Sequence, residues 1–202
     1  MANKTMTPSI TTGQIDKATA QFRDALVKHR KEFSSKVVQQ VLGTDNLGMR
    51  LLEPFRSLVE AVSDLIIRQV KVDRSLTPQE ALKATGRKQY VNDNVVADMP
   101  QGEGDEVEVV FFKLGRWIGD NELEKEYELR GLIPHDPISL AAVNEADPDF
   151  ADEHPNGTHW KDDASGAWCF AAFNRGLVER FVGVGRSGDE WGGYWWFAGC
   201  RK

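Results

Sequence analysis

The densest group of side chains able to bind a metal ion lies between residues 145 and 159. It consists of carboxylates and imidazoles, namely Glu145, Asp147, Asp149, Asp152, Glu153, His154 and His159. Oxygen ligands at this density would suit calcium, but their spacing matches no calcium-binding loop and the glycine that turns such a loop is missing. An acidic loop in contact with solvent is the better interpretation. The sequence therefore predicts neither a metal site nor a cofactor.

Nucleophilic catalysis would need a serine or cysteine with a base beside it, and the sequence shows no such motif. It contains no Gly-x-Ser-x-Gly pattern, and Cys169 lies inside an apolar segment. The glycine pairs Gly183/Gly185 and Gly192/Gly193 form no phosphate-binding pattern, because no lysine opens a helix after them. The four histidines stand apart from any nucleophile motif: His29, His135, His154 and His159. These observations predict that the protein is not an enzyme.

The two cysteines, Cys169 and Cys200, are too few for a disulfide framework and lack the spacing of metal ligands. They flank the tryptophan-rich C-terminal segment, so strands at its two ends would be able to bring them together. Two free and mostly buried thiols are the prediction that we favour, with a disulfide as the alternative.

The composition is that of a folded protein, with 202 residues of which 41% are hydrophobic and 28% charged. No run of about 18 apolar residues is present, which predicts a soluble protein without a membrane span. The first residues lack the apolar core of a secretory signal, and the localisation stays open between the cytoplasm and an exported or phage-borne protein.

Charge is distributed unevenly along the chain. Residues 1–88 carry 15 basic and 9 acidic side chains, and residues 89–202 carry 10 basic and 22 acidic ones. The acidic half would repel phosphates, and the basic side chains of the first half alternate with acids, as on a solvent-exposed helix face. Nucleic acid is therefore not the expected partner.

The elements that position these side chains fall into two groups, and the first is helical. Apolar residues recur at helical spacing over residues 14–42 and 47–72, which predicts two long helices, the first ending at Gly43. Thr77 and Glu80 form a capping box around Pro78, which predicts a short helix over residues 78–85. Residues 1–88 are thus predicted to form a helical module, through which the protein would be able to oligomerise.

After residue 88 the chain changes to β-branched and aromatic segments separated by Gly, Asp and Pro. Strands are predicted at residues 95–97, 107–114, 168–173, 179–186 and 195–201. Helices are predicted at residues 121–130 and 136–146, the second capped by Asp136 with Pro137 in its first position. Residues 147–167 are predicted to be a long polar connection. The fold class is α+β: a helical module, then a mixed domain with antiparallel strands over residues 89–202.

The C-terminal segment alternates in a way that separates two faces of a strand. Within residues 179–186, Val182 and Val184 share one face, and Phe181, Gly183 and Gly185 share the other. An outward face of one phenylalanine and two glycines is a poor sheet surface by propensity. It is more typical of a face used for contact, although outward glycines are also found where a core strand bends.

The end of the chain, residues 192–201 (Gly-Gly-Tyr-Trp-Trp-Phe-Ala-Gly-Cys-Arg), resembles the close of C-type-lectin-like domains of the formylglycine-generating type. It is most similar to the variable proteins of diversity-generating retroelements, whose members are bacterial or phage proteins. In that family a reverse transcriptase copies a template with errors at adenines, and the mutated copy replaces the 3′ end of the target gene. The resemblance covers residues 160–202, extends more loosely to residue 107 and does not reach the residues before 88.

The resemblance implies a codon rule, because varied codons that begin as asparagine codons cannot become Trp, Lys, Glu, Gln or Met codons. Fixed positions would be Trp168, Glu179, Glu190, Trp191, Trp195, Trp196 and Lys202. The rule allows variation within about residues 173–200, Cys200 included. Apart from Cys200, the positions allowed to vary are the expected ligand contacts: Asn174, Arg175, Gly176, Leu177, Val178, Phe181, Gly183, Gly185, Ser187, Gly188, Gly193 and Tyr194.

The sequence thus predicts a receptor-type, ligand-binding protein whose C-terminal surface is diversified to bind varied partners, either proteins or cell-surface molecules. The expected hot spots are Phe181, Tyr194, Leu177 and Arg175. Two alternatives stay open. One is an enzyme of the formylglycine-generating or a hydrolase type, centred on Cys169 or the acidic loop. The other is a helical assembly protein, or one associated with nucleic acid, that acts through residues 1–88.

Overall fold

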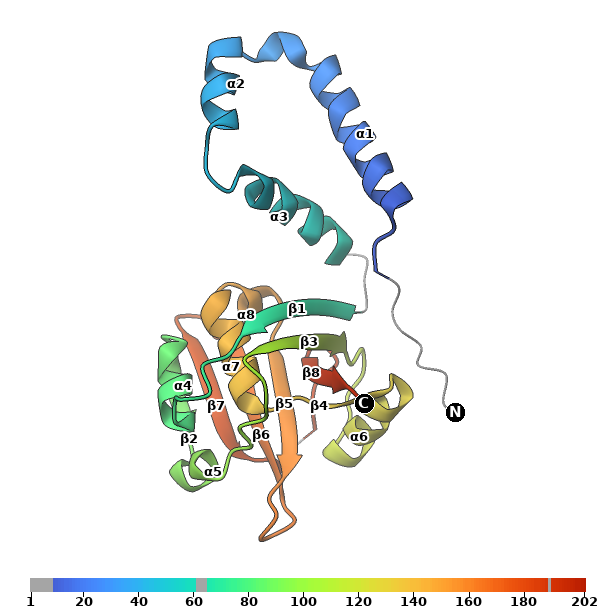
Figure 1. Cartoon of the computed structure of the whole chain (residues 1–202). Coiled ribbons are helices and arrows are strands. Elements are labelled where there is room, and N and C mark those ends of the chain that lie inside the picture. Colours follow the sequence, from blue (N-terminus) through green and yellow to red (C-terminus); the bar gives the residue numbers. More distant parts are fainter. Residues whose placement is uncertain (1–8, 61–64, 189) are drawn as a thin grey trace. The chain divides into compact units, whose positions relative to one another are not determined.

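The computed structural model describes residues 9–60, 65–188 and 190–202. The chain divides into two compact units, Met1–Leu58 and Val59–Lys202. The first is helical and the second is built on a mixed β-sheet, so the α+β class is confirmed (Figure 1). The division falls about thirty residues earlier than the boundary predicted near residue 88, because the segment from residue 65 onwards belongs to the sheet.

The first unit contains α1 (Thr12–Lys28), a 3-10 turn η1 (Arg30–Glu32), α2 (Ser35–Leu42) and most of α3 (Leu47–Glu60). A capping box at Thr11 and Gln14 starts α1. The single helix predicted over residues 14–42 is interrupted, because the backbone at Phe33 and Ser34 is extended. The apolar periodicity continues across this break and therefore does not reveal it.

The sheet of the second unit has eight strands. Its order is β1 (Leu65–Lys71), β3 (Glu106–Lys113), β8 (Trp196–Arg201), β5 (Asn156–Lys161), β6 (Trp168–Arg175), β7 (Arg180–Arg186) and β2 (Lys88–Val91), with β4 (Leu132–Pro134) also paired to β8. The pairs β2–β7 and β5–β8 are parallel and the others antiparallel. The sheet thus joins the beginning of this unit to the end of the chain.

The helix predicted over residues 47–72 is wrong in its second half. Residues 65–71 form β1, which pairs with β3 along its whole length. Ile66 and Val70 point into the core while Ile67 and Gln69 are exposed. A short run of β-branched residues fits a half-buried strand as well as a helix, and only the pairing with β3 decides between them.

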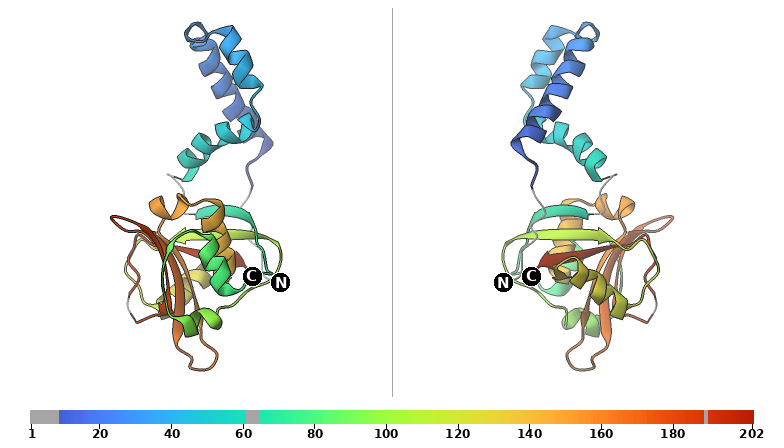
Figure 2. Two further views of the ribbon diagram at one scale, coloured as in Figure 1. Left: turned by 90° about the vertical axis from the view of Figure 1, so that its left-hand side faces the viewer. Right: turned by 90° about the vertical axis from the view of Figure 1, so that its right-hand side faces the viewer.

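Helices cover both faces of the sheet. On one face α4 (Pro78–Ala84), α5 (Asp93–Ala97), α7 (Pro137–Ala146) and α8 (Phe150–Glu153) contribute to a core with the inner sides of β1, β3, β6 and β7. On the other face α6 (Asp120–Leu129) packs through Leu123 and Tyr127 against Phe112 and Phe197. The two views of Figure 2 show α6 and α7 on opposite sides of the sheet.

Local capping signals predict α4 and α7 correctly. Thr77 and Glu80 form both bonds of the capping box, and the Asp136 carboxylate accepts a hydrogen bond from the Ser139 amide. Two other predictions are wrong. Residues 95–97 belong to α5, started by an Asn92 cap, and the polar connection 147–167 contains α8 and β5. Asn156 and Thr158 of β5 are buried, and hydrogen bonds within the core offset the cost of burying their polar side chains.

Candidate functional site

The two faces of β7 differ as the alternation predicts. Val182 and Val184 are buried in the core under α4, α5 and α7. Phe181, Gly183 and Gly185 lie on the opposite face and are partly exposed. The inward valines provide the apolar surface that β7 buries in this core. The outward side chains of β7 are not needed for that packing.

The neighbouring strands add residues to this outward face. In the β6–β7 ladder, Asn174 lies opposite Phe181, Ala172 opposite Gly183 and Phe170 opposite Gly185. The parallel strand β2 places Tyr90 beside Gly183. Directly paired residues point to the same side of a sheet, so three strands share one surface.

This surface is hollowed into a groove of about 500 Å³, which we call the sheet groove. Its lining comes from β2, β6 and β7 and from the segment before β8: Tyr90, Phe170, Ala172, Asn174, Phe181, Gly183, Arg186, Ser187, Gly188, Glu190, Trp191 and Trp195. Five of the twelve predicted contacts line it, namely Asn174, Phe181, Gly183, Ser187 and Gly188.

Aromatic side chains form the walls of the sheet groove. Trp191 packs edge-on against Phe170 and Trp195, with ring centroids 5.5 and 5.4 Å apart. Tyr90 and Phe181 make a second edge-on pair at 5.7 Å. Large rings in such mutual contact lose little conformational freedom when a ligand covers them, which favours binding.

Several glycines of this surface leave room for a side chain. A Cβ atom at Gly183 or Gly185 would lie 3.6 Å from the Phe170 ring, an ordinary contact. At Gly188 it would meet no atom within 4 Å. At Gly176 the nearest atom, 3.4 Å away, belongs to the side chain of Phe181. These four positions can accept a Cβ atom without disturbing the packing beneath them.

Gly193 is closed, which argues against its place among the positions expected to vary. A Cβ there would lie 2.6 Å from the Arg116 amide nitrogen and 2.7 Å from the Gly115 carbonyl carbon. Backbone cannot move aside as a flexible side chain can. Gly157 and Gly199 are tight as well, with carbonyl oxygens at 3.2 and 3.1 Å.

The remaining predicted contacts lie outside the sheet groove. Gly176, Leu177 and Val178 form the turn between β6 and β7, where both apolar side chains are almost fully exposed. Arg175 precedes this turn, and its guanidinium pairs with Asp152 of α8 at 2.8 Å. Tyr194 is half exposed and stacks at a tilt on Trp195, with the ring centroids 5.7 Å apart.

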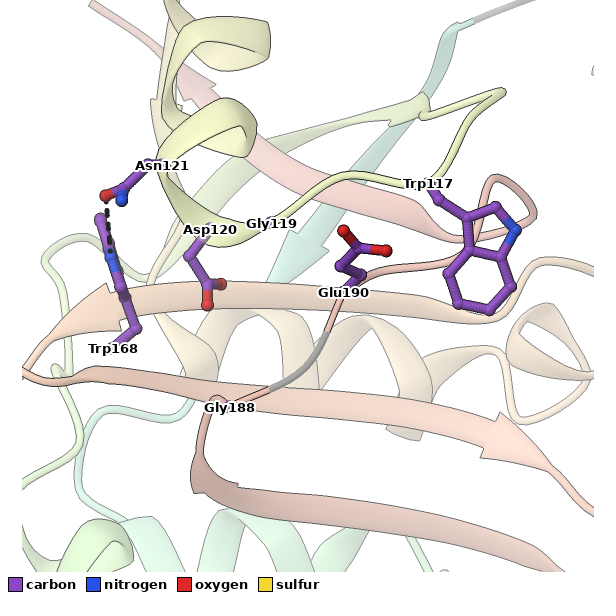
Figure 3. A pocket seen from close by; sticks show the side chains of 7 residues that line it. All are labelled: Trp117, Gly119, Asp120, Asn121, Trp168, Gly188 and Glu190. Carbon is purple, nitrogen blue, oxygen red and sulfur yellow. Dashed lines mark hydrogen bonds between the residues drawn. The ribbon is translucent and has the colours of Figure 1, made fainter.

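A second hollow of about 820 Å³ adjoins the sheet groove and shares Gly188 and Glu190 with it. We call it the tryptophan pocket; its lining is Trp117, Gly119, Asp120, Asn121, Trp168, Gly188 and Glu190. Figure 3 shows Trp168 at one end and Trp117 at the other, with the carboxylates of Asp120 and Glu190 between them. The indole nitrogen of Trp168 donates to Asn121 Oδ1 at 3.3 Å.

An ionic network centred on the buried His159 includes Asp120, which lines the tryptophan pocket. His159 Nδ1 lies 3.1 Å from Asp120 Oδ1 and His159 Nε2 lies 2.9 Å from Glu124 Oε1. The Trp191 indole donates to the same Asp120 oxygen at 3.0 Å, and the His159 ring stacks on Trp168 with centroids 4.5 Å apart. The network therefore connects α6 to Trp168 and to Trp191.

The charges of this network determine its protonation. Burial alone would lower the pKa of His159, but the hydrogen bonds and charges of Asp120 and Glu124 raise it. Burial would raise the pKa of Asp120, yet the bonds from His159, Ser187 and Trp191 lower it. The two carboxylates thus favour the charged form of the histidine.

The acidic segment of residues 145–159 is not a loop, because it contains α8 and the start of β5, although Glu145, Asp149 and Glu153 are exposed as expected. Asp149 and Asp152 pair with Arg180 at the start of β7, and His159 is buried in β5. Burial would raise the pKa of Asp152, but Arg180 and Arg175 lower it. Across residues 9–60, 65–188 and 190–202, no three His, Cys, Asp or Glu side chains are grouped to hold a metal ion.

Both cysteines are free thiols, as predicted. Cys169 is buried in β6, and Cys200 is partly exposed in β8. Burial raises the pKa of both thiols, which lowers their nucleophilicity at neutral pH.

Sequence reasoning misses the lining residues that come from distant segments. Tyr90 reaches the groove only because β2 pairs in parallel with β7, and Trp117 and Asp120 reach the pocket because Ile118 bridges Trp191. Phe170 and Ala172 share one face of β6 with Asn174, so extending the alternation to that strand would have found them.

Comparison with protein-family models, curated proteins and solved structures finds no match to this chain. Among the described residues, no helix combines the length and the apolar character needed to cross a membrane.

Proposed function

We propose that this protein binds a macromolecular ligand, a protein or a cell-surface molecule, through the sheet groove and the adjoining β6–β7 turn. We further propose that the second unit is a C-type-lectin-like domain whose surface a diversity-generating retroelement alters. The binding mechanism is surface complementarity: a rigid aromatic wall limits the entropy lost on binding, and the variable side chains set the specificity.

The observation that carries the proposal is the contrast between open and closed glycines in one short segment. Gly183, Gly185 and Gly188 accept a side chain, whereas Gly193, a few residues further on, does not. The open positions face the groove or its rim, and the closed one is packed against the backbone at residues 115–116. A surface that can change while its support stays fixed is what diversification requires.

The distribution of tryptophans supports the same proposal. Trp191 and Trp196 are buried, and Trp195 packs against Trp191 in the second core. Trp168 is fixed by Asn121 and His159. Of the tryptophans that the codon rule leaves unchanged, Trp191 and Trp195 line the groove, Trp168 lines the adjoining tryptophan pocket and Trp196 lies in the core.

The proposal also indicates where a ligand would bind most strongly. Leu177 and Val178 are almost fully exposed, Phe181 adds a partly exposed ring inside the groove, and Tyr194 adds a half-exposed ring outside it. Exposed apolar side chains next to an aromatic groove are typical hot spots. Arg175 is less available than the sequence predicts, since Asp152 already holds its guanidinium.

Sequencing the 3′ end of the gene in many members of one population tests the proposal. Amino-acid changes should concentrate at the open positions, with Gly188 and Gly183 varied and Gly193 constant. Trp168, Trp191 and Trp195 should also stay constant. Changes as frequent elsewhere in the gene, or equally frequent at the tryptophan codons, would refute it. The glycines at 188 and 193 are each other's control, because composition alone predicts the same behaviour for both.

A further inference from the structure

The helices of the first unit leave their apolar side chains uncovered. Among residues 9–58, no side chain whose burial is described is buried. Fifteen large apolar side chains there are more than a third exposed: Ile10, Ile15, Phe22, Leu26, Val27, Phe33, Val37, Val38, Val41, Leu42, Met49, Leu51, Leu52, Phe55 and Leu58. The described part of the second unit, nearly three times as long, has only nine of these.

The apolar side chains of these helices follow the spacing of helix-packing seams. In α1, Ile15, Ala18, Phe22 and Ala25 recur at intervals of three, four and three residues, the spacing of a coiled-coil seam. In α3, Leu51, Phe55 and Leu58 recur in the same way. Amphipathic helices of this kind gain most of their stability from packing of the apolar face.

The uncovered area matches that of a protein interface. Each of the fifteen side chains exposes about 80 Å² of apolar surface, so together they expose about 1,000 Å². A stable interface needs about 800 Å² from each partner, so the apolar area that these helices expose is large enough for one. Covering this surface therefore calls for another protein surface of similar size.

The charges beside the seams identify the kind of partner. On α1 the acidic Asp16 and Asp24 alternate with Lys17, Arg23 and Lys28. A face of mixed sign does not attract a polyphosphate backbone or an anionic lipid surface, but it suits a like copy of itself. In a two-fold dimer the same surface patch of both copies forms the interface. One sequence therefore supplies both of its sides.

From these observations we infer that the helical segment 12–58 joins two copies of this chain into a dimer. The seams of α1 and α3 from one copy pack against those of the other, and each copy carries one sheet groove.

Sedimentation of the full-length chain over about a hundredfold range of concentration tests the inference. The wild type should have a mass near 45 kDa, twice the 22.6 kDa of one chain, and dissociate on dilution. Phe22→Lys and, independently, Leu51→Lys should raise the dissociation constant at least about tenfold, since each places a charge in a seam. Lysine is a good helix former, so the helices themselves are kept.

The matched control is Ala20→Lys, which adds the same charge to the opposite side of α1 and should leave the dissociation constant unchanged. All six tryptophans lie beyond residue 116, so their fluorescence reports the second unit alone and should be identical in every variant. A monomer at all concentrations would overturn the inference. So would association that all three variants weaken equally, or a wild-type monomer that binds phosphatidylcholine–phosphatidylserine vesicles or duplex DNA instead.

Discussion

Replacement of Gly193 by alanine provides the sharpest test of the separation between open and closed positions. The added Cβ would lie 2.6 Å from the Arg116 nitrogen, about 0.9 Å inside an ordinary contact of about 3.5 Å. Overpacking of this kind costs about 1–3 kcal/mol. The Gly115 amide donates to the Gly193 carbonyl at 2.9 Å, and displacing it would cost about 1 kcal/mol more. Gly193→Ala should therefore destabilise the second unit by about 2–4 kcal/mol.

The control is Gly183→Ala, where the new Cβ meets Phe170 at 3.6 Å. Alanine there restricts the unfolded chain, so this variant should gain about 0.4–1 kcal/mol. Thermal unfolding followed by tryptophan fluorescence should give a Tm lower than wild type by on the order of 10 °C for Gly193→Ala and equal or slightly higher for Gly183→Ala. If Gly193→Ala matches the wild type, or if Gly183→Ala is equally damaging, the contrast between these positions is refuted.

Two buried ionic groups give further predictions. The pKa of His159 is raised in the folded state, so its contribution to stability is complete below its ordinary pKa of 6.5 and is lost as the pH rises through the folded value. The guanidinium midpoint of the wild type should thus fall between neutral and alkaline pH, and that of His159→Gln should fall less. Asp136 pairs with Arg74 at 2.9 Å; burial would raise the pKa of Asp136, but its bonds with His135, Arg74 and Ser139 lower it to about 2. Asp136→Asn should cost about 3–5 kcal/mol in urea unfolding at pH 7. The wild type should lose this stabilisation as the pH falls from about 4 towards 2, and a variant as stable as the wild type at pH 7 would contradict the pairing.

Elements whose signal is local could be predicted from the sequence. The capping box of Thr77 and Glu80 and the cap of Asp136 each occupy four residues, and both mark true helix starts. The alternation in β7 is equally local, because Val182 and Val184 need only the strand itself to share a face. In these cases the physical cause lies within the segment that shows the pattern.

Features that depend on distant pairing could not be predicted. Residues 65–71 carry apolar side chains that fit a helix, and their strand conformation depends on pairing with β3 about forty residues later. Tyr90 enters the groove because β2 pairs with β7, some ninety residues further along the chain. The different behaviour of Gly188 and Gly193 has the same origin, since only the approach of residues 115–116 closes the second.

The backbone ladders explain how the groove can tolerate change. The strands β2, β6 and β7 are held by main-chain hydrogen bonds and by inward side chains such as Val182, neither of which depends on the outward residues. The same arrangement leaves glycines in the groove and few side chains that could anchor a ligand, so a single groove is expected to bind weakly.

A dimer formed through the helical segment would offset this weak binding. Two linked grooves on a ligand with repeated sites can bind about 10²–10⁴-fold more tightly than one, without any new contact. Dimerisation would then raise the affinity for the ligand, and diversification would set which ligand is bound.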